Sequence, residues 1–265
     1  MLELRPDQFS RVSPLLAALP QSVLPYAVCQ GFNPGRIFVD DPQMPHRALL
    51  WTPVGYFFLC GQPTSEPDTL LDISSCLTGT MVPAAQEKGE TGFIFITSPG
   101  WEPALPALLP NRRLISIYRR PFVLDAPAFA SLTAPSIPPG FDLVRMDAKL
   151  VEQTSLPACW GSPEAFVRHG FGFALLHEGQ MAASCATVFT SDRAVEIDVQ
   201  TAEPYRRRGF ALITAKAFLA ECIRRGLRPN WECFWDNQPS TALAARLGFM
   251  PLPDFPVTYW EETAG

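Results

Sequence analysis

The stretch that decides how this chain folds is Tyr205-Arg206-Arg207-Arg208-Gly209-Phe210-Ala211. An alternating run at 194–201 precedes it and is typical of a strand, and an apolar run with helical spacing follows at 212–225. A strand that leads through a glycine loop into a helix predicts a phosphate site, because loop N–H groups and the helix dipole both attract anions. Gly209 can take a positive φ without steric cost, and the three arginines can bind phosphate oxygens. The simpler alternative is a solvated arginine cluster ahead of a helix.

Two motifs resemble those of the GNAT N-acetyltransferases. The pattern Arg206-x-x-Gly209-x-Ala211 matches the family signature Gln/Arg-x-x-Gly-x-Gly/Ala, whose loop wraps the pyrophosphate of acetyl-coenzyme A. Downstream, the order strand, Asn237-x-x-Ser240, helix and Gly248-Phe249 resembles the ending of the same family. The resemblance covers about residues 141–260 and implies that Arg206, Arg207, Arg208, Gly209, Phe210, Ala211, Asn237 and Ser240 contact the acetyl-coenzyme A co-substrate.

A finer resemblance concerns the residues around this loop. Glu196-Ile-Asp-x-x-Thr201 before the loop and Trp231-x-Cys233 after it look like the zwittermicin-resistance type of acetyltransferase. That group carries an extra N-terminal domain. The resemblance therefore implies a two-domain chain.

Composition and charge exclude several other classes of protein. The 265 residues are enough for one large or two modest domains, and the net charge of −5 implies no general affinity for nucleic acid or anionic lipid. The seven cysteines show no C-x-x-C spacing, so we expect neither a disulfide framework nor a metal site. No signal peptide or membrane-spanning run is visible, so we expect a cytoplasmic protein.

Periodicity and turn residues predict an α+β fold. Strands are expected at 48–52, 56–60, 92–97, 114–118, 141–145, 171–176, 181–190, 194–201, 230–235 and 257–261. Helices are expected at 12–19 (stopped at Pro20), 70–81, 103–109, 147–155 and 212–225, and from Ser162 and Asn237 onward. The resemblance makes this order a GNAT fold, with a mixed, mostly antiparallel sheet flanked by helices.

The predicted domains are separated by a Pro/Ala-rich stretch. Residues 1–125 form a smaller α+β domain, which is interpreted as a degenerate GNAT-like half. Residues 126–140 lack periodicity and are interpreted as a semi-stiff linker, and residues 141–265 form the acetyltransferase domain.

Candidate catalytic residues lie on the strand at 194–201. Glu196 and Asp198 share one face, which is either simply the wet face of a strand or the wall of an amine-binding cleft. A carboxylate can take the proton of an ammonium group, and two carboxylates two residues apart tend to raise one pKa. Either residue is therefore a candidate general base, and the choice between them stays open.

The end of the same strand has a second role by resemblance. In GNAT proteins it separates from the next strand, and its free backbone groups, here at Val199, Gln200 and Thr201, pair with the pantetheine arm. A backbone amide near Val199 could bind the oxyanion. Many GNAT proteins place a Tyr seven residues after the Asn to protonate the thiolate, but this chain has Ala244 there. The alternatives are a proton from Ser240, Cys233 or water, or a thiolate that leaves unprotonated.

Other reactive residue types have simpler interpretations. His177 falls in a predicted hairpin turn and is expected to be exposed, and His169 is expected at the surface or at a helix cap. Cys185 and Cys233 are expected to be small core residues, since no base for an acyl-cysteine is visible. Asn237 is also a natural helix N-cap.

The sequence thus predicts an acetyl-coenzyme A-dependent N-acetyltransferase that acts on the primary amine of a small molecule by direct attack. A non-catalytic acyl-coenzyme A sensor or interaction module is the alternative, and acetylation of proteins is a third. The expected partners are acetyl-coenzyme A and a small amine, with a homodimer left open and with neither nucleic acid nor membrane.

Overall fold

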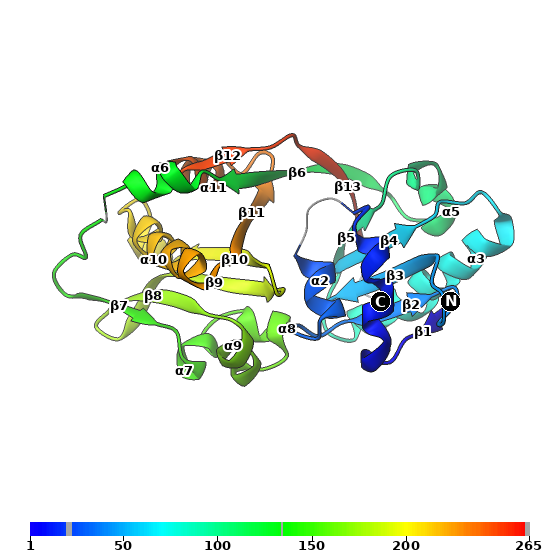
Figure 1. Ribbon diagram of the computed structural model, residues 1–265, viewed down its shortest axis with the longest axis horizontal. Coiled ribbons are helices and arrows are strands. Elements are labelled where there is room, and N and C mark those ends of the chain that lie inside the picture. The colour runs from blue at the N-terminus through cyan, green and yellow to red at the C-terminus, as the bar shows by residue number, and fades with distance from the viewer. Residues whose placement is uncertain (20–22, 134, 263–265) are drawn as a thin grey trace. The chain divides into compact units, whose positions relative to one another are not determined.

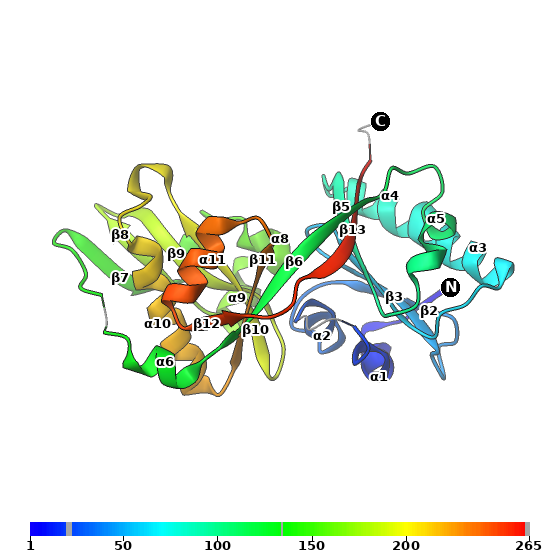
Figure 2. The same cartoon turned by 90° about the horizontal axis from the view of Figure 1, so that it is seen from above.

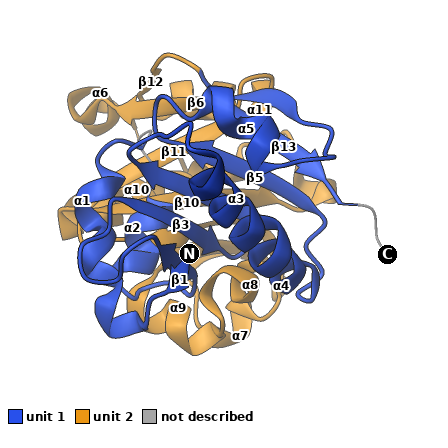
Figure 3. Cartoon of the chain, turned by 90° about the vertical axis from the view of Figure 1, so that its right-hand side faces the viewer, with its two compact units in different colours: residues 1–118, 255–265 blue, residues 119–254 orange. Residues whose placement is uncertain are grey.

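The computed structural model describes residues 1–19, 23–133 and 135–262, which divide into two compact units (Figure 3). Unit 1 comprises Met1–Tyr118 and Phe255–Gly265, and unit 2 comprises Arg119–Asp254. Each unit contains a mixed sheet flanked by helices, so the predicted α+β fold class is confirmed.

Unit 1 has the strand order β1-β2-β3-β4-β5-β13, in which β4 and β5 run parallel and the other neighbours antiparallel. Its elements are β1 (Leu2–Glu3), η1 (Pro6–Val12), α1 (Ser13–Leu16), α2 (Leu24–Cys29), β2 (Arg36–Val39), β3 (Arg47–Thr52), β4 (Tyr56–Gly61), α3 (Pro67–Cys76), η2 (Leu77–Met81), α4 (Val82–Gln86), β5 (Gly92–Thr97), η3 (Glu102–Ala104), α5 (Leu105–Leu108) and β13 (Phe255–Glu261).

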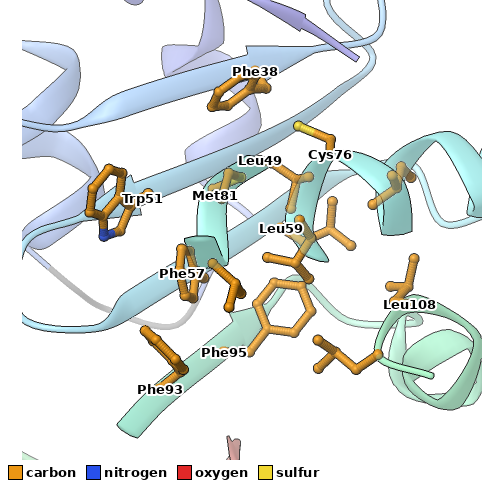
Figure 4. Packing of buried hydrophobic residues seen from close by; sticks show 14 of the residues in the cluster. Phe38, Leu49, Trp51, Phe57, Leu59, Cys76, Met81, Phe93, Phe95 and Leu108 are labelled. Carbon is orange, nitrogen blue, oxygen red and sulfur yellow. The ribbon is translucent and has the colours of Figure 1, made fainter. Parts of the chain in front are cut away.

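The core of unit 1 lies between its central strands and the helices that follow them. Figure 4 shows Leu49 of β3, Leu59 of β4 and Phe95 of β5 close to Met81 and Leu108, and all five are buried. Strand β5 is buried on both faces, which explains why its sequence is a continuous apolar run.

The helix predicted at 70–81 is longer and less regular than expected. It begins at Pro67 as α3, widens into the π-helical η2 and continues as α4. Pro83 lacks an N–H group, and its ring crowds the carbonyl four residues earlier, which accounts for the wider turn before it.

Unit 2 has the strand order β7-β8-β9-β10-β11-β6, with β10 and β11 parallel and β12 paired to β6 (Figure 1). Its elements are β6 (Ile115–Leu124, of which residues 119–124 belong here), α6 (Ala126–Ser131), β7 (Phe141–Arg145), α7 (Ala148–Val151), α8 (Leu156–Trp160), α9 (Pro163–His169), β8 (Gly172–His177), β9 (Gln180–Thr190), β10 (Ala194–Thr201), η4 (Glu203–Tyr205), α10 (Phe210–Arg225), β11 (Arg228–Phe234), α11 (Gln238–Arg246) and β12 (Phe249–Pro251).

Helices cover both faces of the unit 2 sheet. Figure 1 shows α10 on one side of β8 and β9 and α7 and α9 on the other, and in Figure 2 α10 and α11 lie in front of the strands. The core under α10 and α11 includes Val195 of β10, Phe218 of α10, Trp231 of β11 and Leu247. Because Val195 packs into this core, the next residue, Glu196, points to the opposite face of the sheet.

The two units repeat one topology. In each, four antiparallel strands are followed by a helical segment, a parallel strand, another helix and an antiparallel last strand. The last strand of unit 2 is the second half of β6, which precedes the rest of unit 2 in the chain. The last strand of unit 1 is β13, which follows unit 2.

These units differ from the predicted domain boundaries. The strand expected to end at Tyr118 continues to Leu124, and the strand expected at 257–261 belongs to unit 1. The expected linker contains α6, whose N-cap Asp125 accepts a hydrogen bond from the Ala128 amide at 3.0 Å and whose Phe129 is buried. Apolar burial and the cap explain why residues 126–131 form a helix.

Two predicted helices also differ in length. The helix expected at 147–155 stops at Val151, because the Thr154 hydroxyl donates to the Val151 carbonyl at 2.7 Å and accepts from the Leu156 amide at 3.2 Å. Within the helix expected at 12–19, residue 12 ends η1 and α1 covers only Ser13–Leu16. The expected stop, Pro20, lies outside the described residues.

Candidate active site

Strands β10 and β11 pair for only part of their length and then diverge. Their parallel ladder has the rows Ala194↔Arg228, Val195↔Pro229 and Glu196↔Asn230. Beyond these rows β10 continues to Thr201 against β9, while the next residues of β11 pair with β6. In unit 1, by contrast, the ladder between β4 and β5 continues to Thr97, the end of β5.

A cavity of about 890 Å³ occupies the opening between β10 and β11. Its walls come from unit 2: the end of β10, the end of β11, the loop that leads into α10 with the first turn of that helix, α11, and Arg119 of β6. Its lining residues are Arg119, Ile197, Asp198, Val199, Gln200, Thr201, Tyr205, Arg206, Arg207, Gly209, Phe210, Ala211, Leu212, Trp231, Glu232, Cys233, Phe234, Asn237, Pro239, Ser240, Ala242, Leu243 and Arg246.

The loop into α10 has the backbone shape of an anion site. Gly209 is the N-cap of α10 with φ 82°, and Arg207 also has a positive φ of 61°. The first N–H groups of a helix have no partner within the helix, and no side chain caps this one. They and the positive end of the α10 dipole therefore lie beside the cavity, which is an arrangement that can bind phosphate.

The three arginines of the loop do not lie together. Arg206 and Arg207 line the cavity, whereas Arg208 is not among the lining residues. The Arg208 guanidinium lies 4.8 Å from the ring centre of Phe210 and 5.7 Å from those of Tyr205 and Phe141. Arg208 thus makes cation–π contacts with the aromatic side chains behind the loop.

The N-terminus of α11 forms the opposite wall. Asn237 Oδ1 accepts from the Ser240 amide at 3.1 Å, so Asn237 caps the helix as well as lining the cavity. Ser240 Oγ accepts from Trp231 Nε1 at 3.0 Å, and Cys233 Sγ lies 3.8 Å from Thr241 Oγ1.

Ala244 does not contribute to this wall. It is fully buried in the core under α10 and α11, whereas its neighbours Ala242 and Leu243 line the cavity. Alanine has no acidic proton, so position 244 supplies no general acid to the cavity.

The two predicted carboxylates lie at the base of the opening. Glu196 Oε2 accepts from Asn230 Nδ2 at 2.7 Å in the last paired row, and Asp198 Oδ2 accepts from Gln200 Nε2 at 2.8 Å. Asp198 lines the cavity, whereas Glu196 is not among the lining residues. Burial raises the pKa of both carboxyl groups, that of Glu196 to about 8.

The second cause of the Glu196 shift is a residue that the sequence analysis did not single out. Glu232 of β11, rather than Asp198, is the carboxylate whose charge raises the pKa of Glu196. Glu232 accepts from Arg119 Nε at 2.7 Å, and both side chains are buried, with exposed fractions of 8% and 10%. Burial raises the pKa of Glu232, an effect that Arg119 opposes.

A sequence signal for Glu232 exists, but not for Arg119. Asn230 and Glu232 alternate with the apolar Trp231 and Cys233, so they had to share a face of the predicted strand. Arg119 precedes the predicted linker, and only the pairing of β6 with β11 brings it to the cavity.

The histidine predicted to be exposed has specific contacts. The His177 ring stacks on Phe141 at 4.4 Å, and its Nδ1 lies 3.0 Å from the hydroxyl of Tyr205, which lines the cavity. His177 is the last residue of β8 rather than part of the turn, and this position explains its partial burial. His169 ends α9.

Among the residues that line the cavity there is one cysteine, Cys233. All seven cysteines are free and buried. Within residues 1–19, 23–133 and 135–262, no group of three or more His, Cys, Asp or Glu side chains could hold a metal ion. The described helices include none that is long and apolar enough to span a bilayer.

Comparisons with known proteins bear on the family and the fold of the chain. The chain is 28% identical over 241 residues to the uncharacterized N-acetyltransferase YdfB of Bacillus subtilis (strain 168), with 88% of each covered. Its fold is similar to that of a GCN5-related N-acetyltransferase-like protein from Streptococcus suis 89/1591, with a TM-score of 0.69, 24% identity and coverage of 96% of this chain and 99% of that one. A tandem GNAT protein from the clavulanic acid biosynthesis pathway has a TM-score of 0.61 and 15% identity, with 100% of this chain and 98% of that one covered.

A family model matches nearly the whole sequence. The model described as GNAT acetyltransferase covers residues 13–257, which include most of unit 1 and all of unit 2. The chain therefore belongs to the GNAT acetyltransferase family.

Proposed function

We propose that unit 2 transfers an acetyl group from acetyl-coenzyme A to the primary amine of a small molecule, by direct attack in a ternary complex. The observation that carries this proposal is the divergence of β10 and β11 directly beside the glycine loop of α10. One opening thus combines a site for phosphate, free strand edges for an extended arm, and carboxylates for an amine.

The residues around the opening suit the parts of acetyl-coenzyme A. The loop amides of Gly209, Phe210 and Ala211, with Arg206 and Arg207, would hold the pyrophosphate. The backbone of Val199, Gln200 and Thr201 would pair with the pantetheine arm, with Asn237 and Ser240 on the facing wall. Arg208 would act from behind the loop through its aromatic contacts.

The acceptor chemistry rests on the carboxylates. An ammonium group must lose a proton before its nitrogen can attack a thioester, and Glu196 or Asp198 would take it. The raised pKa of each carboxyl group suits a base that works near neutral pH. The amide of Val199 would stabilise the oxyanion, and the thiolate would leave with a proton from the attacking nitrogen, from Ser240 or from water.

Finer assignments extend the same proposal. The residues Glu196-Ile197-Asp198 and Asn237 support a zwittermicin-resistance-type enzyme, acting in the cytoplasm on an amino-group-bearing antibiotic or metabolite. Unit 1 repeats the topology of unit 2 but keeps β4 and β5 paired, which supports a degenerate GNAT-like half. A homodimer is compatible with this proposal.

Thermal unfolding with and without acetyl-coenzyme A tests the site. A ligand at about a hundred times its Kd should add about 2.7 kcal/mol to the free energy of unfolding. Gly209→Trp should lose this shift, because a Cβ at Gly209 meets no atom within 4 Å and the indole would cover the loop, while the backbone strain of a side chain at this positive φ is shared by the control variant. Gly226→Trp is the matched control, since Gly226 lies at the other end of α10 with φ 68° and equal free space.

The outcomes separate two functions. The transferase is supported if acetyl-coenzyme A stabilises wild type and Gly226→Trp but not Gly209→Trp, and if wild type then releases free thiol when a panel of amines is added. Tight binding without turnover supports the alternative, a non-catalytic acyl-coenzyme A sensor, which the buried Ala244 favours. If wild type binds no acyl-coenzyme A, both proposals fail.

A further inference from the structure

Four polar side chains form two hydrogen-bonded pairs at the point where β10 and β11 separate. Glu196 of β10 is bonded to Asn230 of β11, and Glu232 of β11 is paired with Arg119 of β6. Asn230 and Glu232 lie two residues apart on one strand and therefore share a face, and Glu196 faces Asn230 in the last row of the ladder. The group thus places two carboxyl groups side by side on neighbouring strands.

The partners of the two carboxyl groups are different. Glu232 is bonded to a guanidinium, which favours its charged form, whereas Glu196 receives a hydrogen bond from a neutral amide. Both Glu232 and Arg119 are almost fully shielded from water, so the effective dielectric around this pair is low. When two nearby carboxyl groups compete for one proton, the group without the cation takes it.

The remaining neighbours of Glu196 do not reverse this order. Arg119, and Arg228, whose Nη1 lies 3.4 Å from Asn230 Oδ1, each favour a charged Glu196, but each does so less strongly than Glu232 opposes it. Asp198 on the same strand is bonded to Gln200. On β9, the residue opposite Glu196 is the uncharged Phe189.

We infer that Glu232 is a positioning residue, which Arg119 holds as a carboxylate so that the exchangeable proton of the site resides on Glu196. This inference rests on the proposed function for its chemical use. The ammonium group of the acceptor gives one proton to the Glu196 carboxylate, and its nitrogen then bonds to the thioester carbon. The C–S bond breaks, and the second proton of the nitrogen neutralises the thiolate.

The proton on Glu196 can be observed without any turnover. The infrared carbonyl band of a protonated carboxyl group is followed against pH in wild type, Glu196→Gln, Glu232→Gln and Asp254→Asn. Wild type should show a band that titrates near neutral pH and that Glu196→Gln removes. In Glu232→Gln the midpoint should fall by about one pH unit or more, a tenfold loss of proton affinity.

Asp254→Asn is the matched control for the loss of a carboxylate bonded to β6. Asp254 pairs with Arg120, the neighbour of Arg119 in the sequence, at 2.7 Å, and neither residue lines the cavity. This variant should leave the midpoint unchanged. If Glu232→Gln does not fold because Arg119 loses its partner, Glu232→Gln with Arg119→Gln removes both charges, and the midpoint should still fall, by a smaller amount.

The pH profile of kcat/KM adds a second readout. The acidic limb of the profile should move to lower pH in Glu232→Gln by the same amount as the infrared midpoint, which a purely structural role would not produce. A band that titrates identically in wild type and Glu232→Gln overturns the inference, whether or not the protein transfers acetyl groups. A shifted band in a protein without turnover refutes the proposed function and leaves the assignment of the proton intact.

Discussion

At the scale of single residues, the candidate site depends on where charge is buried. Glu196 and Glu232 lie on adjacent strands, and one arginine, Arg119, is bonded to Glu232. Burying two carboxyl groups beside one guanidinium disfavours one of the two charges. The energetic consequence is a carboxyl group that keeps its proton at a pH where an exposed Glu would have lost it.

This proton makes stability depend on pH in a defined direction. The pKa of Glu196 is raised from 4.5 to about 8 in the folded protein, so the folded state binds this proton more tightly than the unfolded state. The resulting stabilisation is present at acidic pH and is lost as the pH rises through this window, by up to about 1.4 kcal/mol per pH unit. We expect Glu196→Gln to weaken the dependence of the free energy of unfolding on pH. Urea unfolding measured between about pH 5 and about pH 8, which covers most of the interval between the two pKa values, tests this.

A variant far from the pair provides the control. Asp254 has its pKa lowered by Arg120, so Asp254→Asn should leave the slope in this window as in wild type. Parallel curves for wild type and Glu196→Gln would show that Glu196 does not hold the proton.

At the scale of elements, the ends of the two helices build the walls of the cavity. Helix α10 begins and ends at glycines in the left-handed region, Gly209 and Gly226, so its length is set by backbone geometry. Helix α11 begins with the side-chain cap of Asn237 and ends at Arg246, with Leu247 as its C-cap, followed by Gly248 at φ 84°. The caps fix where the free N–H groups of each helix lie relative to the opening between β10 and β11.

The cap of α11 makes a measurable contribution to stability. Asn237→Ala removes the hydrogen bond to the Ser240 amide and should lower the free energy of unfolding by about 0.5–2 kcal/mol. Asn237→Asp keeps an acceptor at the same place and should remain close to wild type. Chemical denaturation of the three proteins measures this, and equal stability for all of them would mean that the cap is not used.

At the scale of the whole molecule, the two units are not two successive halves of the chain. Unit 2 needs residues 119–124 of β6, which pair with β11 and β12, and unit 1 needs β13. A boundary drawn in the Pro/Ala-rich stretch would remove from unit 2 both the strand beside β11 and the Arg119 partner of Glu232.

Fragments distinguish the two boundaries. Residues 119–254 retain every strand of the unit 2 sheet and should unfold cooperatively, with the sheet signal preserved in circular dichroism. Residues 141–265 lack β6 and α6, which exposes the edge of β11 and removes Phe122 and Phe129 from the core. That fragment should be unstable or aggregate, and a cooperative transition in 141–265 as strong as in 119–254 would refute the assignment of β6.

The sequence determined what depends on neighbours along the chain. The alternation at 194–201 and the helical spacing at 212–225 predicted β10 and α10, and the glycine after three arginines predicted the turn between them. Ser162 and Asn237 predicted helix starts, because caps act within a few residues.

Tertiary structure decided what depends on pairing between distant segments. The ion pair between Arg119 and Glu232 joins residues 113 positions apart, and no local sequence pattern predicts it. The orientation of Arg208 toward Phe210, the contact of His177 with Tyr205 and the order in α6 likewise follow from packing. Local periodicity indicates which face of a helix or strand is buried. Which unit a strand joins, and which buried charges pair, are settled only when the sheets assemble.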